Sequence, residues 1–172
     1  FESHPIVNSL LPYYVRQGDI KPRPDVARLD GRTVTFVDGT RDEVDVIVWA
    51  TGYRIRFPFL DQRDLDLQDG RPRFYLNVFH PRYDTLFFAG LIQPDSGQFG
   101  LVHWQTLLAA RYARAARLGQ PAAERLRRRK ALGAEDLGNG IRYANSTRHY
   151  LEVEHWSYRK KLQRWKTRLD KE

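Results

Sequence analysis

The stretch Asp45–Tyr53, with the sequence D-V-I-V-W-A-T-G-Y, constrains the fold of this chain more than any other. Its residues Val46–Trp49 form an uninterrupted apolar run, which is typical of a short strand buried in a parallel sheet. The small residues Ala50, Thr51 and Gly52 follow at the carboxyl end of that strand, where ligands bind in open α/β sheets. We therefore predict a buried strand that ends at a ligand site. The alternative is that Gly52 only makes a tight turn.

The first part of the chain is expected to form one helix and a few strands. Apolar residues recur at helical spacing before Gly18, a residue type that commonly ends helices. Alternating apolar and polar residues flank Asp30–Gly31, which is a strong hairpin signal. The predicted elements are a helix over 4–17, hairpin strands over 26–29 and 33–37, a turn over 38–40 and a strand over 44–49.

The remainder is expected to be mixed at first and then helical. The polar segment 61–73 predicts a surface loop, and strands are predicted over 75–79 and 86–89. Helices are predicted over 101–118 and 121–132, the second with Pro121 in its first turn, followed by a loop over 133–140. Two amphipathic stripes are predicted: Trp104, Leu107, Leu108, Arg111, Tyr112 and Ala115 in one, and Leu151, His155, Tyr158, Leu162, Trp165 and Leu169 in the other.

Size and composition narrow the class of protein. The chain has 172 residues, of which 41% are hydrophobic, enough for one domain or two small ones with a core. Because there is no cysteine, disulfides, zinc–thiolate sites and cysteine nucleophiles are excluded. Neither a signal peptide nor an apolar run of about 18 residues occurs, so we expect a cytoplasmic protein. The start at Phe1 and the lack of methionine suggest a piece of a longer protein or a processed chain.

The net charge of +8 comes largely from residues after 120, including the final helix. We interpret it as a solvated basic face and expect no nucleic-acid partner, because no helix-turn-helix, zinc or RNA-binding motif accompanies it. A basic amphipathic helix is also a form that binds anionic membrane surfaces, and this alternative stays open.

The sequence offers no catalytic acid or base and no metal site. His80 and His103 are the residues to consider as a general base, because imidazole exchanges protons near neutral pH. Neither has a carboxylate at a spacing that would pair with it, and for His103 we expect packing or hydrogen bonding. No pair of histidines with an acidic partner has metal-ligand spacing, and no G-x-S-x-G motif indicates a hydrolase.

A second candidate site is the glycine-rich stretch 90–100, between a predicted strand and a predicted helix. Such a turn places backbone N–H groups at the positive end of a helix, which favours an anion or an electron-rich ring oxygen. For Gln93 and Pro94 the alternative is ordinary turn chemistry.

Four strings occur in a fixed order: D-G-T at Asp38–Thr40, the stretch Asp45–Tyr53, F-P-F-L at Phe57–Leu60 and G-L-I-Q-P at Gly90–Pro94. Together they resemble the C-terminal part of a flavin-containing monooxygenase, a class B flavoprotein monooxygenase, over roughly residues 4–119. Related flavoprotein disulfide reductases and N-hydroxylases carry strings similar to A-T-G-Y.

The resemblance implies an α/β fold, the C-terminal part of a flavoprotein with two Rossmann-like dinucleotide-binding domains, with incomplete sheets and C-terminal helices. Residues 1–52 would end the NADPH-binding domain, residues 53–120 would belong to the FAD-binding domain, and residues 121–172 would be a helical extension. Neither of the two G-x-G-x-x-G turns that such an enzyme needs occurs in this chain. We therefore expect the missing N-terminal part of the same protein as a partner, and unpaired strand edges in this chain alone.

The resemblance also implies the cofactors FAD and NADPH. One group of small residues would lie where the chain passes from one dinucleotide-binding domain to the other, near both cofactors. A second group would face FAD. Leu91 stands where many relatives have an acidic residue, so a hydrogen bond to the ribityl chain would fall to the backbone or to Gln93. The implied cofactor-binding residues are Ala50, Thr51 and Gly52 at the crossing, and Gly90, Leu91 and Gln93 at the flavin.

For the intact protein, the resemblance implies that NADPH reduces FAD and that O2 adds to give a flavin C4a-hydroperoxide. This species would oxygenate a soft nucleophile, an amine nitrogen or a sulfide sulfur, in a small-molecule substrate. One alternative is a Baeyer–Villiger or N-hydroxylating monooxygenase. The other is a non-catalytic remnant or interaction module with a basic amphipathic helix. The 172-residue chain alone is expected to be inactive.

Overall fold

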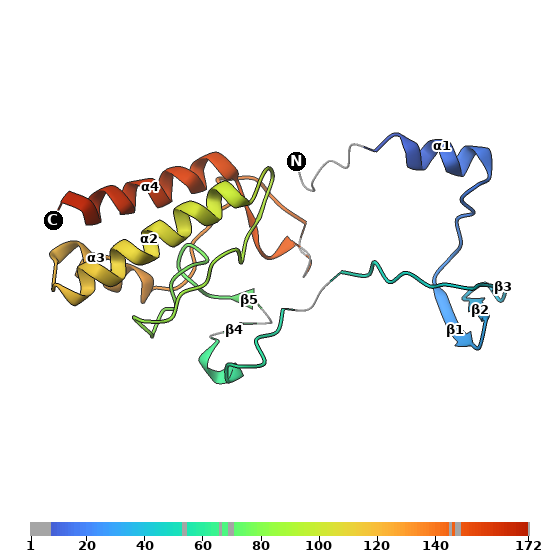
Figure 1. Cartoon of the computed structure of the whole chain (residues 1–172), viewed down its shortest axis with the longest axis horizontal. Helices are drawn as coiled ribbons and strands as arrows, with labels where there is room; N and C mark the ends of the chain where they lie inside the picture. The colour runs from blue at the N-terminus through green and yellow to red at the C-terminus, as the bar shows by residue number, and fades with distance from the viewer. Residues whose placement is uncertain are drawn as a thin grey trace. The chain divides into compact units, whose positions relative to one another are not determined.

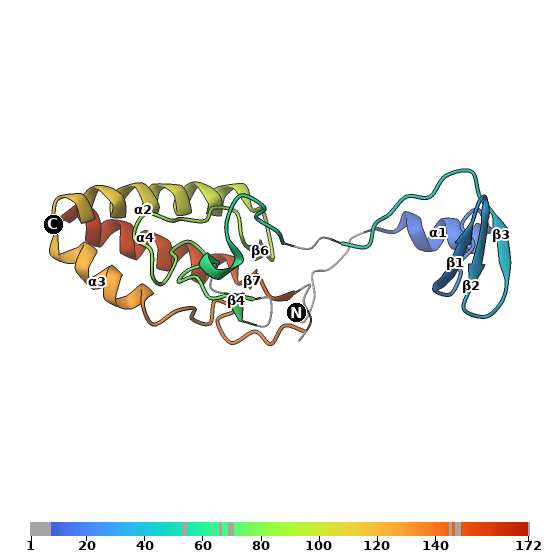
Figure 2. The ribbon, with the colours of Figure 1, turned by 90° about the horizontal axis from the view of Figure 1, so that it is seen from below.

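The computed structural model describes residues 8–52, 55–65, 67–68, 71–144, 146 and 149–171. They fall into two compact units, one within Pro5–Arg54 and the other within Ile55–Glu172. The fold is α/β, with small sheets and helices (Figure 1, Figure 2). The first unit carries a three-stranded sheet, and the second is built around three helices with two short two-stranded sheets.

The first unit begins with helix α1 (Leu10–Gln17), which is shorter than the predicted helix over 4–17. The side chain of Asn8 accepts a hydrogen bond from the Leu10 backbone N–H at 3.0 Å, at the start of the helix. Gly18 ends the helix in the left-handed conformation with φ 83°, as predicted. The predicted residues 4–7 lie outside the described residues.

The sheet of the first unit contains β1 (Val26–Asp30), β2 (Thr33–Phe36) and β3 (Arg41–Glu43), all antiparallel in the order β1-β2-β3. The hairpin predicted at Asp30–Gly31 is confirmed, with Gly31 at φ 57° in the turn. The predicted turn over 38–40 is also confirmed: the Asp38 carboxylate accepts hydrogen bonds from the backbone N–H and the hydroxyl of Thr40, at 2.9 and 2.7 Å.

The prediction of a buried strand over 44–49 is wrong for this chain. Strand β3 ends at Glu43, and Val46–Trp49 belong to no strand. The segment is also exposed, with Val48 84% and Trp49 68% accessible. Its apolar sequence favours burial, but burial needs a neighbouring strand and a covering layer. The small sheet of this unit supplies neither to these residues.

The second unit is dominated by α2 (Phe99–Arg117), α3 (Pro121–Lys130) and α4 (His155–Lys171), close to the predicted bounds. In both views α4 lies alongside α2 (Figure 1, Figure 2), and the two helices are in contact along their length. Shorter elements precede or connect them. These are η1 (Gln62–Asp64), β4 (Leu67–Gln68), β5 (Arg71–Pro72), β6 (Gln93–Pro94) and β7 (Glu152–Val153).

The core of the second unit lies between α2, α3 and α4. Tyr158, Leu162 and Leu169 of the predicted stripe are buried and form the docking face of α4. Leu151, the first residue of the predicted stripe, lies before the helix, which begins at His155. The α2 face is rotated from the prediction, since Trp104 and Leu107 are only half-buried. The buried α2 residues, spaced four, three, four and three apart, are Leu101, Gln105, Leu108, Tyr112 and Ala115.

The predicted strands over 75–79 and 86–89 are not formed as strands. Tyr75 and Phe79 instead close a tight turn through a backbone hydrogen bond of 2.9 Å, and Phe79 makes one isolated bridge to Phe87. Leu76 and Asn77 have positive φ angles of 54° and 50°, which extended strand residues do not adopt. The aromatic side chains that indicated strands are nevertheless buried, because the turn itself sits in the core.

Candidate functional site

The glycine-rich stretch 90–100 leads into α2, and Gly90 is its fixed point. Gly90 has φ 80°, a left-handed conformation that a residue with a side chain rarely adopts. Its backbone N–H donates to Gln105 Oε1 at 2.8 Å, and its carbonyl oxygen accepts from Gln98 Nε2 at 2.8 Å. The backbone N–H of Gly90 is therefore held by Gln105 of α2, and its carbonyl oxygen by Gln98, the N-cap residue of the same helix.

Gln105 continues this contact into the core. Its Nε2 donates to the Tyr158 hydroxyl at 2.7 Å, and that hydroxyl donates to the backbone carbonyl of Leu76 at 2.6 Å. The side chains of Gln105 and Tyr158 are fully buried, and burial raises the pKa of Tyr158, so its hydroxyl stays protonated. Sequence reasoning missed Gln105. The available signal was its place in the seven-residue repeat of apolar positions on α2.

Gln93 lies in strand β6 rather than in a plain turn. Strand β6 pairs in parallel with β7, and Gln93 N donates to the Leu151 carbonyl at 2.7 Å. The Gln93 side-chain nitrogen donates to Glu152 Oε1 at 3.1 Å. The amide nitrogen of this candidate residue is thus engaged within the chain, and its position is set by a segment about sixty residues later.

Leu91 and the start of α2 face different surroundings. Leu91 is partly buried against a small aromatic cluster that includes Phe74 and Phe88, whose rings stack at 3.9 Å. The start of α2 is open: Phe99 is 92% exposed, and nothing lies within 4 Å of a side chain built on Gly97 or Gly100. This end of the helix is therefore accessible to solvent.

The other candidate residues, Ala50, Thr51 and Gly52, lie in the first unit and are exposed. Gly52 has φ 85°, so the chain turns there in a conformation that requires glycine or strain. Tyr53 lies outside the described residues. The structure brings Gly90, Leu91 and Gln93 together in the second unit, and it groups the other three only with each other.

His80 is buried and shapes the turn that leads to Asp84. Its Nδ1 accepts hydrogen bonds from the backbone N–H groups of Arg82 and Tyr83, both at 3.1 Å. Its ring also stacks on Tyr83, with centroids 4.7 Å apart. His103, by contrast, lies on the exposed side of α2, where its ring meets Trp104 edge-on.

The same turn is anchored by a buried cation, Lys130, at the end of α3. Its side chain is only 1% exposed, and it forms an ion pair with Asp84 at 3.1 Å. Its ammonium group also donates to the backbone carbonyls of His80, Pro81 and Tyr83, at 2.8, 3.1 and 3.1 Å.

The Asp84 carboxylate is contacted by three donor side chains, one from α2 and two from α3. Besides Lys130, it accepts from the Tyr112 hydroxyl at 2.8 Å and from Arg127 Nε at 2.7 Å. Burial alone would raise the pKa of Asp84, but the Tyr112 and Lys130 hydrogen bonds and the Lys130 and Arg127 charges outweigh it and lower this pKa. Burial, then the bond to Asp84, raise the pKa of Tyr112. These groups form a structural tie between α2, α3 and the turn.

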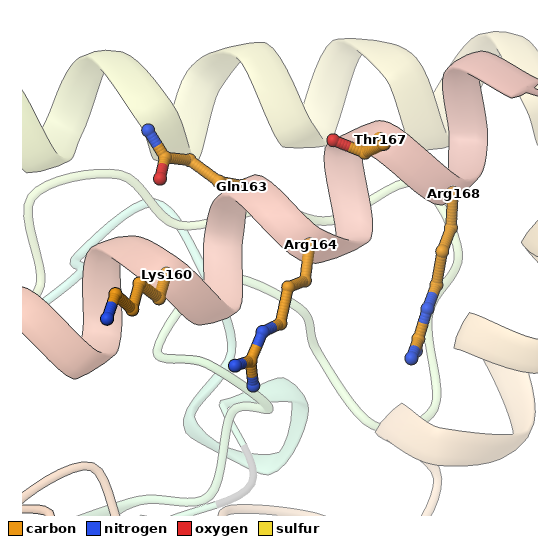
Figure 3. A pocket seen from close by; sticks show the side chains of 5 residues that line it. All are labelled: Lys160, Gln163, Arg164, Thr167 and Arg168. Atoms are coloured by element: carbon orange, nitrogen blue, oxygen red, sulfur yellow. The ribbon is translucent and has the colours of Figure 1, made fainter.

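The outward face of α4 carries a basic row, which we define as Lys160, Arg164 and Arg168. With Gln163 and Thr167 it lines an open hollow of about 460 Å³, and Figure 3 shows Arg164 and Arg168 extending to the same side of the helix. Among the described residues, none forms an ion pair with this row. The row is a solvated basic surface, without buried polar groups that would build a defined site.

The model of the family described as Flavin-binding monooxygenase-like matches residues 1–153, which include both candidate groups and end in β7. This chain belongs to that family. Among similar members of the flavin-binding monooxygenase-like family is N-oxide-forming dimethylaniline monooxygenase 2 of Rattus norvegicus. It is 40% identical over 110 residues, which cover 62% of this chain and 21% of the relative.

Two further relatives are both named flavin-containing monooxygenase 1. Flavin-containing monooxygenase 1 of Sus scrofa is 34% identical over 93 residues, covering 52% of this chain and 18% of the relative. The protein of the same name from Homo sapiens is 35% identical over 92 residues, covering 52% and 17%. The chain thus spans about a fifth of the length of the curated relatives it matches.

At the open start of α2, Gly97 and Gly100 leave the backbone uncovered beside the exposed Phe99. The Gly90 N–H does not add to this surface, since Gln105 accepts its hydrogen. Within the described part of the chain, no group of acidic or histidine side chains has the geometry of a metal site. No described helix is long and apolar enough to cross a membrane.

Proposed function

We propose that this chain is the C-terminal part of a flavin-dependent monooxygenase that uses FAD and NADPH to oxygenate an amine nitrogen or a sulfide sulfur. The observation that carries the proposal is the family match over residues 1–153. The names of the relatives support it, because several are dimethylaniline monooxygenases that form N-oxides. Because these names describe the formation of an N-oxide, they fit an amine nitrogen as the oxygenated atom.

In the proposed assignment, residues 1–52 end the NADPH-binding domain, residues 53–120 contribute to the FAD-binding domain and residues 121–172 form a helical extension. The exposed run Val46–Trp49 supports this division. An apolar segment this open to water is stabilised when another sheet strand and a covering layer are added. The N-terminal part of the same protein would supply both.

The proposed flavin surface consists of Gly90, Leu91, Gln93 and the open start of α2. The backbone N–H groups at the helix start favour electron-rich oxygens of the flavin. Leu91 would offer an apolar contact, and the pairing of Gln93 with β7 would keep this edge in place. Ala50, Thr51 and Gly52 would lie near both cofactors.

The described candidate residues include no side chain that acts as an acid or base. When bound, the flavin supplies the oxygen chemistry, with NADPH as the electron source. The chain's own residues would bind and orient the flavin and exclude water from it. This division of labour agrees with a site built from glycines, a leucine and a glutamine.

The test is purification of the protein at its natural length, followed by extraction and identification of any bound flavin. NADPH consumption is then measured with and without a tertiary amine, a sulfide and a ketone. The proposal expects bound FAD, together with an N-oxide or a sulfoxide as product. A protein that binds no flavin under saturating FAD overturns the proposal, and an ester product from the ketone would instead indicate Baeyer–Villiger chemistry.

A further inference from the structure

We infer that Gln105 and Tyr158 are positioning residues that hold the Gly90 turn in the shape needed to receive flavin. This inference rests on the proposed function for its link to flavin. Its structural basis is a series of three hydrogen bonds. A partly buried bond runs from Gly90 N–H to Gln105, and two buried bonds run from Gln105 to Tyr158 and from Tyr158 to the Leu76 carbonyl.

The direction of every bond in this series is fixed. The Leu76 carbonyl has no proton, so the Tyr158 hydroxyl must donate to it and can only accept from Gln105. Gln105 must therefore turn its NH2 group towards Tyr158, which leaves its oxygen to accept from Gly90. A fully satisfied buried network of this kind specifies one arrangement, because any other leaves a buried polar group unpaired.

Both ends of the series are backbone positions with positive φ angles. Gly90 has φ 80°, and Leu76 has φ 54° although it carries a side chain. For Leu76, which is not a glycine, such a conformation persists only when surrounding contacts hold it. Tyr158 holds the Leu76 carbonyl and orients Gln105, and Gln105 in turn holds the Gly90 N–H, so loss of either weakens the restraint on Gly90.

The same C-terminal segment holds the far side of the stretch as well. Ser96 Oγ and His155 Nδ1 share a hydrogen bond of 2.6 Å, and the His155 backbone N–H donates to Asp95 Oδ1 at 3.1 Å. Gln93 is paired to Leu151. Residues 93–96 are thus held directly by residues 151–155, and Gly90 is held by Gln105, which Tyr158 orients. Tyr158 lies beyond residue 153, where the family match ends, so this restraint comes from the helical extension of this chain.

A purely structural role for Tyr158 would lower stability without acting on Gly90 in particular. Tyr112 provides the matched control, because it is another fully buried tyrosine whose hydroxyl makes one donated hydrogen bond, to Asp84. Tyr158→Phe and Tyr112→Phe each remove a single oxygen atom from the same core. They differ in which backbone segment loses its support.

The experiment uses the protein at its natural length and compares wild type, Tyr158→Phe, Tyr112→Phe and Gln105→Leu. Hydrogen–deuterium exchange by mass spectrometry is followed in peptides that contain Gly90, and FAD affinity is measured by fluorescence quenching. Exchange at Gly90 is expected to accelerate about three- to tenfold in Tyr158→Phe, the factor that one buried hydrogen bond contributes. Gln105→Leu removes the acceptor itself, so its increase is expected to be at least as large.

Tyr112→Phe is expected to leave exchange at Gly90 unchanged, and FAD affinity is expected to fall several-fold in Tyr158→Phe alone of the two tyrosine variants. Unchanged exchange at Gly90 in Tyr158→Phe overturns the inference, even if Gln105→Leu fails to fold. Faster exchange with unchanged FAD affinity overturns the link to flavin. A wild-type protein that binds no FAD is a failure of the proposed function, which the exchange data distinguish from a failure of the positioning role.

Discussion

The ammonium group of Lys130 lies 3.1 Å from Asp84 Oδ1 and is almost completely shielded from water. Asp84 remains partly exposed and holds two further donors, whereas Lys130 depends entirely on Asp84 and on three backbone carbonyls. The two partners therefore differ in what their removal would leave behind. Loss of the cation leaves carbonyls without a donor inside the protein.

Lys130→Met replaces the cation by an apolar side chain of similar length. We expect a loss of about 3 kcal/mol in the free energy of unfolding, near the lower end for breaking a buried ion pair, because Asp84 keeps Arg127 and Tyr112. Urea denaturation measures the change. The control is Arg128→Met on the exposed side of the same helix, expected to change stability by less than about 0.5 kcal/mol. Equal effects of the two substitutions would contradict a structural role for the buried charge.

Asp84 should make the stability of the protein depend on acid pH. Its pKa is lowered in the folded state, so its contribution to stability is present above the ordinary aspartate pKa and is lost as the pH falls through the folded pKa. Asp84→Asn lacks this titration. Urea denaturation at a series of pH values should show the difference in stability between wild type and Asp84→Asn shrinking as the solution becomes more acidic. Parallel pH profiles would show that Asp84 does not contribute in this way.

Gly90→Ala should be costly because of the backbone. A Cβ at this position would meet Gln98 and Val102 only at ordinary contact distances, 3.6 and 3.8 Å, so space does not forbid it. The φ of 80° does disfavour it, by about 1 to 2 kcal/mol. Thermal or urea unfolding measures the loss, with Gly97→Ala as the control, since Gly97 has ordinary φ and open space around it. A loss of the same size at Gly97 would refute the backbone explanation.

Val48→Lys should affect the stability of the 172-residue chain and of the longer protein differently. Val48 is highly exposed, so in the 172-residue chain the substitution should change the free energy of unfolding by less than about 0.5 kcal/mol. In the protein at its natural length, the proposed function places Val48 in a covered strand, where a lysine would be strongly destabilising. Thermal unfolding of both proteins gives the comparison. Val37→Lys, at the exposed turn beside the sheet, is the control and should be tolerated in both.

The elements that sequence patterns predicted correctly are those determined by neighbouring residues. Asp30–Gly31 specifies its hairpin through the turn itself, and Pro121 starts α3 because its fixed φ suits a first helical turn. The stripe of α4 was also readable, because Tyr158, Leu162 and Leu169 lie on one face of a regular helix.

The wrong predictions depended on distant partners or on unusual backbone angles. The apolar run Val46–Trp49 favours burial, but its sequence does not specify the strand and covering layer that would bury it, and the run is exposed in this chain. The aromatic segment around Tyr75 has the composition of a strand, whereas the positive φ of Leu76 is held by Tyr158 from α4, far along the chain. Gln105 was missed for the same reason, since its two partners, Gly90 and Tyr158, lie on two separate segments.

The parallel pairing of β6 with β7 has a consequence for the order in which the protein is made. Gln93 and its partner Glu152 are 59 positions apart, so β6 has no neighbour until β7 has left the ribosome. The apolar face of helix α2 stays uncovered for longer still, because it is covered by α4, which follows β7 in the chain. During translation the second unit is therefore exposed to proteases and chaperones until α4 emerges, and a ribosome that stops before Tyr158 releases a chain without a closed core.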